Sequence, residues 1–181
     1  YLADTFDRRY TALFRTVMTI YQGQYPIMGN PRVMSLKILW DFAMYWGGVA
    51  LLYMHGKLHD NELMERARPS LMGFAGEGFA MQRMFRRWSQ LEPSGGAGGF
   101  VDYCGLPLLE ELNRQLLAPM SDDELIDTLA RNLENARDLA TEIRAQAARC
   151  DPRLAPDAAE VTTSHLSDII GTLWPPLRAR A

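Results

Sequence analysis

The hydrophobic positions of this chain follow helical spacing almost throughout. Between residues 4 and 21 an apolar side chain recurs every three or four positions, the spacing of one stripe on an α-helix. Similar patterns predict helices over residues 30–53, 60–91, 106–117, 121–148 and 158–173. No run alternates strictly between apolar and polar residues, and no Asn-Gly or Asp-Gly hairpin turn occurs. The pattern predicts a single all-α domain over residues 1–181, with about six or seven helices in an irregular bundle.

The segment over residues 25–48 is the least ordinary part of this pattern, because it is apolar on nearly every face. Asn30 is a favoured N-cap and Pro31 fits the first helical position, so the helix starts there. Three interpretations of it are open: the central helix of the bundle, the wall of a ligand pocket, or a membrane segment. A membrane span would place Asp41 well inside the bilayer at a cost of a few kcal/mol, which argues against membrane insertion.

Three further features set the expected helix boundaries. Pro69 is expected to kink or restart the helix that begins near residue 60. The glycines at 73, 76 and 78 indicate either a closely packed partner helix or a local break. Ser121 and Glu124 have the spacing of a capping box and open the longest polar helix, while the glycine-rich residues 93–99 are expected to form a loop.

The composition excludes several classes of protein. Hydrophobic residues make up 48% of the chain and charged residues 23%, which argues against disorder. The net charge of −3 and the short basic groups give no nucleic-acid footprint. Two cysteines, Cys104 and Cys150, are too few for a disulfide scaffold, so we expect free thiols in a reducing, cytoplasmic compartment. The first residue is Tyr1, which raises the interpretation of a C-terminal fragment of a longer protein.

Motifs that would carry catalysis are weak or incomplete. No dinucleotide-binding fingerprint and no P-loop is present. His55 and His59 have helical spacing for a metal but lack a third ligand, so they are only weak candidates. Cys104 has no nucleophile motif around it and is expected to be a buried, inert thiol. No catalytic residue and no metal site is assigned, and an autonomous enzyme using these groups or Asp41 is the weakest of the functional hypotheses.

Lys37, Asp41 and Tyr45 lie four residues apart on one face of the apolar helix. An ion pair in such a setting is costly unless good geometry and further hydrogen bonds offset its desolvation. One interpretation is a structural polar network that fixes the helix register. The other is a polar patch in a ligand pocket, with Trp40 and Trp46 as apolar walls. The ten methionines of the chain suit either a core or an adaptable binding surface.

The same region carries a family resemblance, over Tyr25-Pro26, residues 28–34, Lys37, Trp40-Asp41 and residues 45–47. It resembles a helical segment of bacterial flavoproteins described as FAD-dependent oxidoreductases or tryptophan-halogenase-like proteins. The resemblance implies a helical domain that follows a flavin domain and covers a substrate site or mediates association. The family's FAD fingerprint and its Trp-x-Trp-x-Ile-Pro motif are absent here, so no catalytic or flavin-binding residue can be carried over.

Two functions follow as expectations. The first is an accessory helical domain of a flavin-dependent enzyme without a catalytic motif of its own; its partner would be an upstream flavin domain, and FAD would belong to the parent protein. The alternative is a free-standing helical module that binds a small apolar ligand or a protein partner. A homodimer is possible in either case, and no nucleic-acid or membrane partner is expected.

Overall fold

Helices form almost all of the computed structural model, which describes residues 2–92 and 102–155. No strand occurs in these two ranges. The helices are α1 (Leu2–Tyr21), α2 (Pro31–Met44), α3 (Leu51–Met54), α4 (Asn61–Leu91), α5 (Pro107–Leu117) and α6 (Asp122–Cys150). Four short helical turns join or extend them: η1 (Tyr25–Gly29), η2 (Tyr45–Ala50), η3 (Tyr103–Gly105) and η4 (Pro152–Leu154). The predicted all-α class is confirmed.

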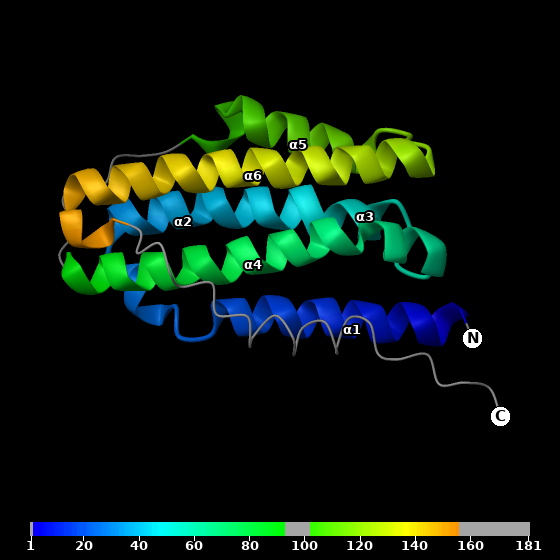
Figure 1. Ribbon diagram of the computed structural model, residues 1–181, viewed down its shortest axis with the longest axis horizontal. Helices are drawn as coiled ribbons and strands as arrows, with labels where there is room; N and C mark the ends of the chain where they lie inside the picture. Colours follow the sequence, from blue (N-terminus) through cyan, green and yellow to red (C-terminus); the bar gives the residue numbers. More distant parts are fainter. Residues whose placement is uncertain (1, 93–101, 156–181) are drawn as a thin grey trace.

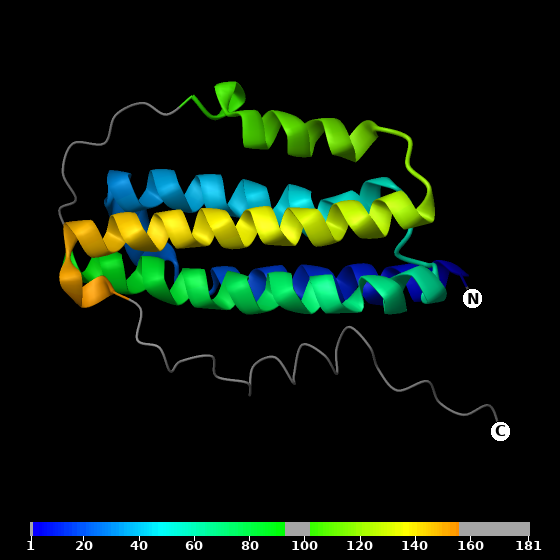
Figure 2. The same cartoon turned by 45° about the horizontal axis from the view of Figure 1, so that its top comes forward.

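The long helices lie side by side in layers (Figure 1). Figure 2 shows α2 with α6 in one layer, α1 with α4 in the next, and α5 on the outer side of the first. The chain reverses direction between successive long helices, so α1, α4 and α6 run one way and α2 and α5 the other. Within the described residues, no helix is long and apolar enough to cross a membrane.

The described residues form five helices, once α2, η2 and α3 are counted as one continuous stretch, where six or seven were predicted for the whole chain. One reason for the lower count is that Pro69 does not restart the helix, since α4 is continuous from Asn61 to Leu91. Pro69 lies on the exposed side of the helix, where water can bond the carbonyl of Glu65 that loses its N–H partner. The predicted helix over residues 158–173 and the predicted loop over 93–99 lie outside the described residues.

Side chains cap the helices as the sequence indicates. The Asn30 side chain accepts a hydrogen bond from the backbone N–H of Val33 at 3.0 Å and starts α2. Ser121 and Glu124 form the expected capping box, in which the Glu124 carboxylate accepts from the backbone N–H of Ser121 at 2.7 Å. These caps fix where α2 and α6 begin.

The apolar character of α2 follows from its neighbours, since it contacts α4, α5 and α6. Val33, Trp40 and Ala43 are buried, but most other side chains of α2 are partly exposed. The prediction of a central helix is therefore not confirmed, because α2 forms part of one layer and α4 and α6 contribute as much to the core. Its side towards α1 is the one that carries polar residues.

The glycines of α4 reflect close packing, and the helix is not broken there. A Cβ atom at Gly73 would overlap with a methyl group of Leu133 on α6. Any side chain at position 73 would therefore require the Leu133 side chain to move, so glycine suits the close approach of α4 and α6. Of the two interpretations of this glycine-rich stretch, the structure supports close packing against a partner helix.

We expect Gly73→Val to destabilise the fold by about 1–3 kcal/mol, because its branched side chain overpacks the α4–α6 contact. Leu133→Ala alone should also destabilise, since it leaves a cavity. The double variant should lose less than the sum of the two, because the small residue makes room for the valine. Urea unfolding of the three variants measures this coupling, and additive losses would contradict the contact.

Candidate functional site

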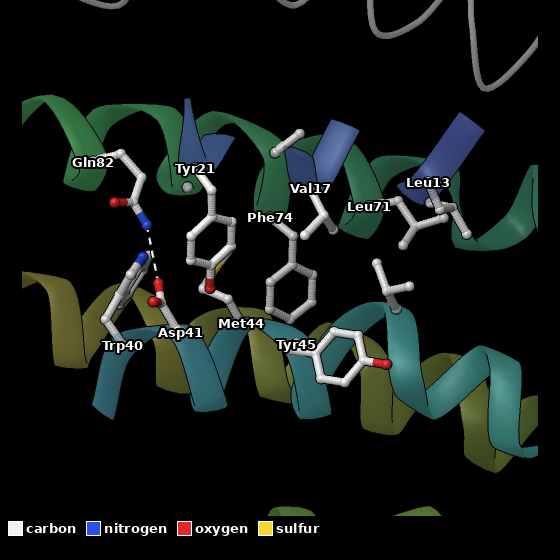
Figure 3. A pocket seen from close by; sticks show the side chains of 13 residues that line it. Leu13, Val17, Tyr21, Trp40, Asp41, Met44, Tyr45, Leu71, Phe74 and Gln82 are labelled. Carbon is white, nitrogen blue, oxygen red and sulfur yellow. Dashed lines mark hydrogen bonds between the residues drawn. The ribbon is translucent and has the colours of Figure 1, made fainter. Parts of the chain in front are cut away.

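A cavity of about 110 Å³ lies between α1, α2 and α4 (Figure 3). Most of its wall is apolar. Figure 3 shows Trp40, Asp41 and Gln82 at one end and Leu13, Leu71 and Tyr45 towards the other. The cavity is lined by Leu13, Val17, Tyr21, Trp40, Asp41, Met44, Tyr45, Val49, Leu71, Phe74, Ala75, Gly78 and Gln82.

The cavity lies in a groove between α1 and the stretch from α2 to α3. Aromatic contacts close this groove at both ends of the cavity. Towards the start of α1, the rings of Phe6 and Tyr10 lie 5.9 and 5.7 Å from the ring of Tyr53. Towards its end, the Tyr21 ring lies beneath the ammonium group of Lys37, 4.1 Å from Nζ to the ring centroid. The cavity is the stretch of the groove that these contacts leave open.

A polar cluster forms the Tyr21 end of the cavity and joins three helices. Lys37 and Asp41 of α2 form an ion pair. The Gln82 side chain of α4 donates to the second carboxylate oxygen of Asp41 at 3.0 Å. The Tyr21 hydroxyl of α1 is close enough to the same carboxylate to lower its pKa as a hydrogen-bond donor. Lys37 is only 3% exposed, so its charge depends on Asp41 for compensation.

Burial dominates the acid–base behaviour of this cluster. It raises the pKa of Asp41 above its ordinary value of 3.8, despite the charge and hydrogen bond of Lys37 and the bonds from Tyr21 and Gln82, which all lower it. Burial is also the largest cause that raises the pKa of Tyr21, and the charge and hydrogen bond of Asp41 raise it further. The Tyr21 hydroxyl is therefore a neutral donor at physiological pH.

Two buried polar atoms at this end have no hydrogen-bond partner: the indole nitrogen of Trp40, a donor, and the side-chain carbonyl oxygen of Gln82, an acceptor. An unpaired buried group costs about 1–3 kcal/mol of stability. Both residues line the cavity. The cluster thus keeps hydrogen-bonding capacity next to an apolar space.

The turn η2 sets the far side of the cavity. It is a π-helical turn, a rare distortion that is frequent at functional sites. Gly47 and Gly48 lie within it, and a Cβ atom at Gly48 would be 3.4 Å from the Phe74 ring. The Gly47 carbonyl accepts a hydrogen bond from Asn132 of α6 at 3.2 Å. The Phe74 ring lies against the backbone of η2 and forms one wall of the cavity.

A second, wider basin of about 610 Å³ adjoins the first, and the two cavities share Tyr21 and Asp41 as a common wall. Gln24 lies in the lining of this basin; the residue is 4% exposed, and its side-chain amide makes no hydrogen bond. Its other lining residues are Met18, Thr19, Gln22, Gly23, Tyr25, Met28, Met34 and Lys37.

The structure brings together four of the five residues named from the sequence. Trp40, Asp41 and Tyr45 line the inner cavity, and Lys37 lines the outer basin. Trp46 does not join them; its ring lies 4.9 Å from Phe42 and packs on the α5 side of α2.

Sequence reasoning missed the residues that α1 and α4 contribute: Tyr21, Phe74 and Gln82. Tyr21 was recognised only as part of the apolar stripe of α1. No sequence signal links Gln82 to Asp41, which lies 41 residues earlier in the chain.

The weaker chemical candidates lie elsewhere. The imidazole of His55 contacts the Gln115 carbonyl oxygen at 3.1 Å, and His59 is exposed. Across residues 2–92 and 102–155, no cluster of three or more potential metal ligands occurs. The expectation of a buried Cys104 is wrong: this free thiol is exposed, as is Cys150, because the short turn η3 leaves it outside the core.

Comparison with protein-family models, with curated proteins and with solved structures finds no match for this chain. The resemblance of residues 25–47 to flavoproteins therefore stays a prediction.

We expect Lys37→Met to lower the free energy of unfolding by about 3–5 kcal/mol at neutral pH, because it leaves the Asp41 carboxylate buried without its cation. Replacing both partners, as Lys37→Met with Asp41→Leu, should cost less than the single change. Lys57→Met is the matched control, since Lys57 pairs with Asp122 at the surface and should cost about 1 kcal/mol or less. This account would be contradicted if the double variant lost as much free energy of unfolding as Lys37→Met and Asp41→Leu lose together when each is made alone.

The raised pKa of Asp41 also sets a pH dependence. Folding favours the protonated carboxyl, so the stability that Asp41 contributes falls as the pH rises from its ordinary value of 3.8 through its folded pKa. We therefore expect the wild-type chain to lose stability relative to the Asp41→Asn variant as the pH rises over this range. The comparison isolates the effect of Asp41, because both chains share the other titrating groups. Urea unfolding from pH 4 upward measures the difference, and a flat or opposite trend would refute it.

Proposed function

We propose that this chain is a helical binding module that holds a small, largely apolar molecule in the cavity between α1, α2 and α4. The observation that carries the proposal is a largely apolar pocket, partly open to solvent, whose one polar end keeps an unpaired donor, Trp40, and an unpaired acceptor, Gln82. Binding sites typically combine such an apolar wall with a few convergent polar groups.

The size of the cavity limits the ligand. Its volume is about 110 Å³, and a dry cavity of about 150 Å³ in another protein holds benzene. A ligand with a single six-membered ring, or a short branched chain, is of the right order. Modest outward movement of Tyr21 or Tyr45, which are 37% and 51% exposed, would admit a larger ring or one more substituent.

The charge of the polar cluster favours a neutral ligand. Asp41 already receives donors from Lys37, Gln82 and Tyr21, and Lys37 balances its charge. An ionic ligand would bring a further buried charge without a partner, which is costly. A neutral hydroxyl or amide group could instead bond the Trp40 indole N–H and the Gln82 carbonyl oxygen after a small shift of the side chains around them.

A second candidate function is the accessory domain of a flavin-dependent oxidoreductase or halogenase-like enzyme in the cytoplasm. One observation favours it: the segment that carries the resemblance, residues 25–47, also supplies Lys37, Trp40, Asp41 and Tyr45 to the two cavities. In this proposal the cavity forms part of the substrate site, and an upstream flavin domain holds the FAD.

We expect phenol and toluene to bind the purified chain, with phenol tighter by up to about tenfold, since one net hydrogen bond contributes about 0.5–1.5 kcal/mol. Ala75→Leu should abolish both, because Ala75 lines the cavity and the larger side chain fills it. Ala80→Leu, on the same helix but outside the cavity lining, is the matched control and should bind normally. Amide shifts in NMR titrations measure binding.

Failure of both probes to shift the cavity resonances at millimolar concentration would refute a preformed ligand site. Equal binding by the Ala75→Leu variant would place the probes elsewhere on the protein. Thermal unfolding of both variants confirms that they are folded, and Ala75→Leu should be at least as stable as the wild type if it fills an empty space.

A further inference from the structure

Large apolar side chains are exposed mainly on one side of the molecule. Ten such side chains are exposed among the described residues, and eight of them belong to α1, to η1 or to the part of α2–α3 that faces α1. We call these eight the α1 face. Its members are Tyr10, Phe14, Met18, Tyr21, Tyr25, Met28, Tyr45 and Tyr53; the remaining two exposed residues are Met54 and Leu117.

Contacts and shared cavities show that the α1 face is one surface. The rings of Tyr10 and Tyr53 lie 5.7 Å apart. Tyr21 and Tyr45 line the inner cavity together. Met18, Tyr21, Tyr25 and Met28 line the outer basin together. The surface therefore follows α1 along its length and continues onto η1.

The extent of this surface suits a stable protein–protein interface. The exposed fractions of its members range from 37% for Tyr21 to 82% for Tyr25. Since an aromatic side chain of full size buries 150–250 Å², eight side chains exposed to this degree present roughly 800 Å². A standard interface covers about 800 Å² on each partner, and apolar patches of this size on soluble proteins mark interaction sites.

The charges on α1 indicate what covers it. Asp7, Thr11 and Arg15 are exposed and lie four residues apart, so they form one line along the helix beside Phe14. In the described part of the chain, neither Asp7 nor Arg15 forms an ion pair. Because both are four positions from Thr11, an antiparallel copy of α1 that crosses at Thr11 would place each Asp7 opposite an Arg15 of its partner.

We propose that the α1 face is the interface of a homodimer in which two α1 helices pack antiparallel about a two-fold axis at Thr11. Such an interface is isologous: each copy supplies the same apolar surface, and two Asp7–Arg15 pairs form at its rim. The small side chain of Thr11 permits close approach at the crossing point. The charge pattern complements itself only in the antiparallel orientation, which is why a second copy is the occupant that fits.

Sedimentation equilibrium of the full chain tests the proposal. We expect a mass of twice the 20.5 kDa of one chain. Phe14→Glu should give a monomer, because it places two like charges within the apolar interface. Leu117→Glu replaces the exposed apolar residue of α5, away from the α1 face, and should remain a dimer. A monomeric wild type, or a dimer that survives Phe14→Glu, would overturn the proposal.

Charge reversal tests the orientation separately. Asp7→Arg gives a chain with arginine at both positions, and Arg15→Asp gives one with aspartate at both. Each alone should self-associate about tenfold more weakly, because like charges then face each other at two places. An equimolar mixture should form a heterodimer at least as tight as the wild-type dimer. Unfolded variants could not produce this rescue, and a mixture that stays monomeric would refute the antiparallel arrangement.

Discussion

The ion pair between Lys37 and Asp41 is the interaction on which this part of the bundle depends. It lies within one helix, but its remaining hydrogen bonds reach out to Tyr21 on α1 and to Gln82 on α4. Two opposite charges can be buried only when their other bonding positions are also filled. A single carboxylate therefore links three helices at this point of the bundle.

The cavity follows from the same requirement. Tyr21 holds the end of α1 close to α2 through Asp41 and Lys37, and the ring contacts of Tyr53 hold its beginning. Between these points α1 rests on α4, while the side chains of Leu13 and Val17 do not fill the space towards Met44 and Phe74. Because α1 contacts the α2–α3 stretch at two places and packs incompletely between them, the bundle contains a binding space without a separate loop to form it.

Much of the fold could be predicted from the sequence, because the spacing of apolar residues and the helix caps are local signals. The caps at Asn30 and Ser121 are where the pattern indicates, and the apolar faces of α2 are explained by its three neighbours. The alternative that the helix restarts at Pro69 is wrong, because whether a helix tolerates proline depends on whether that side of it is exposed, which is a tertiary property. The exposed position of Cys104 likewise depends on how η3 leads into α5.

Only half of the candidate site could be predicted from the sequence, for a related reason. Lys37, Asp41 and Tyr45 share a helix face, so their proximity can be read from their spacing alone. Trp46 is six positions from Trp40, about two-thirds of a turn round the helix from it, and spacing already argues against a common wall. The contributions of Tyr21, Phe74 and Gln82 come from other helices, and only the packing of the bundle brings them to Asp41.

The burial of Lys37 has a practical consequence for the solution chemistry of the protein. The chain contains only two lysines, Lys37 and Lys57. Lys37 is 3% exposed, whereas the Lys57 side chain is 28% exposed. An amine-directed reagent should therefore modify Lys57 in the native protein and reach Lys37 only when α1 separates from α2. Modification of Lys37 therefore reports the separation of α1 from α2, and modification of Lys57 provides a reference within the same molecule.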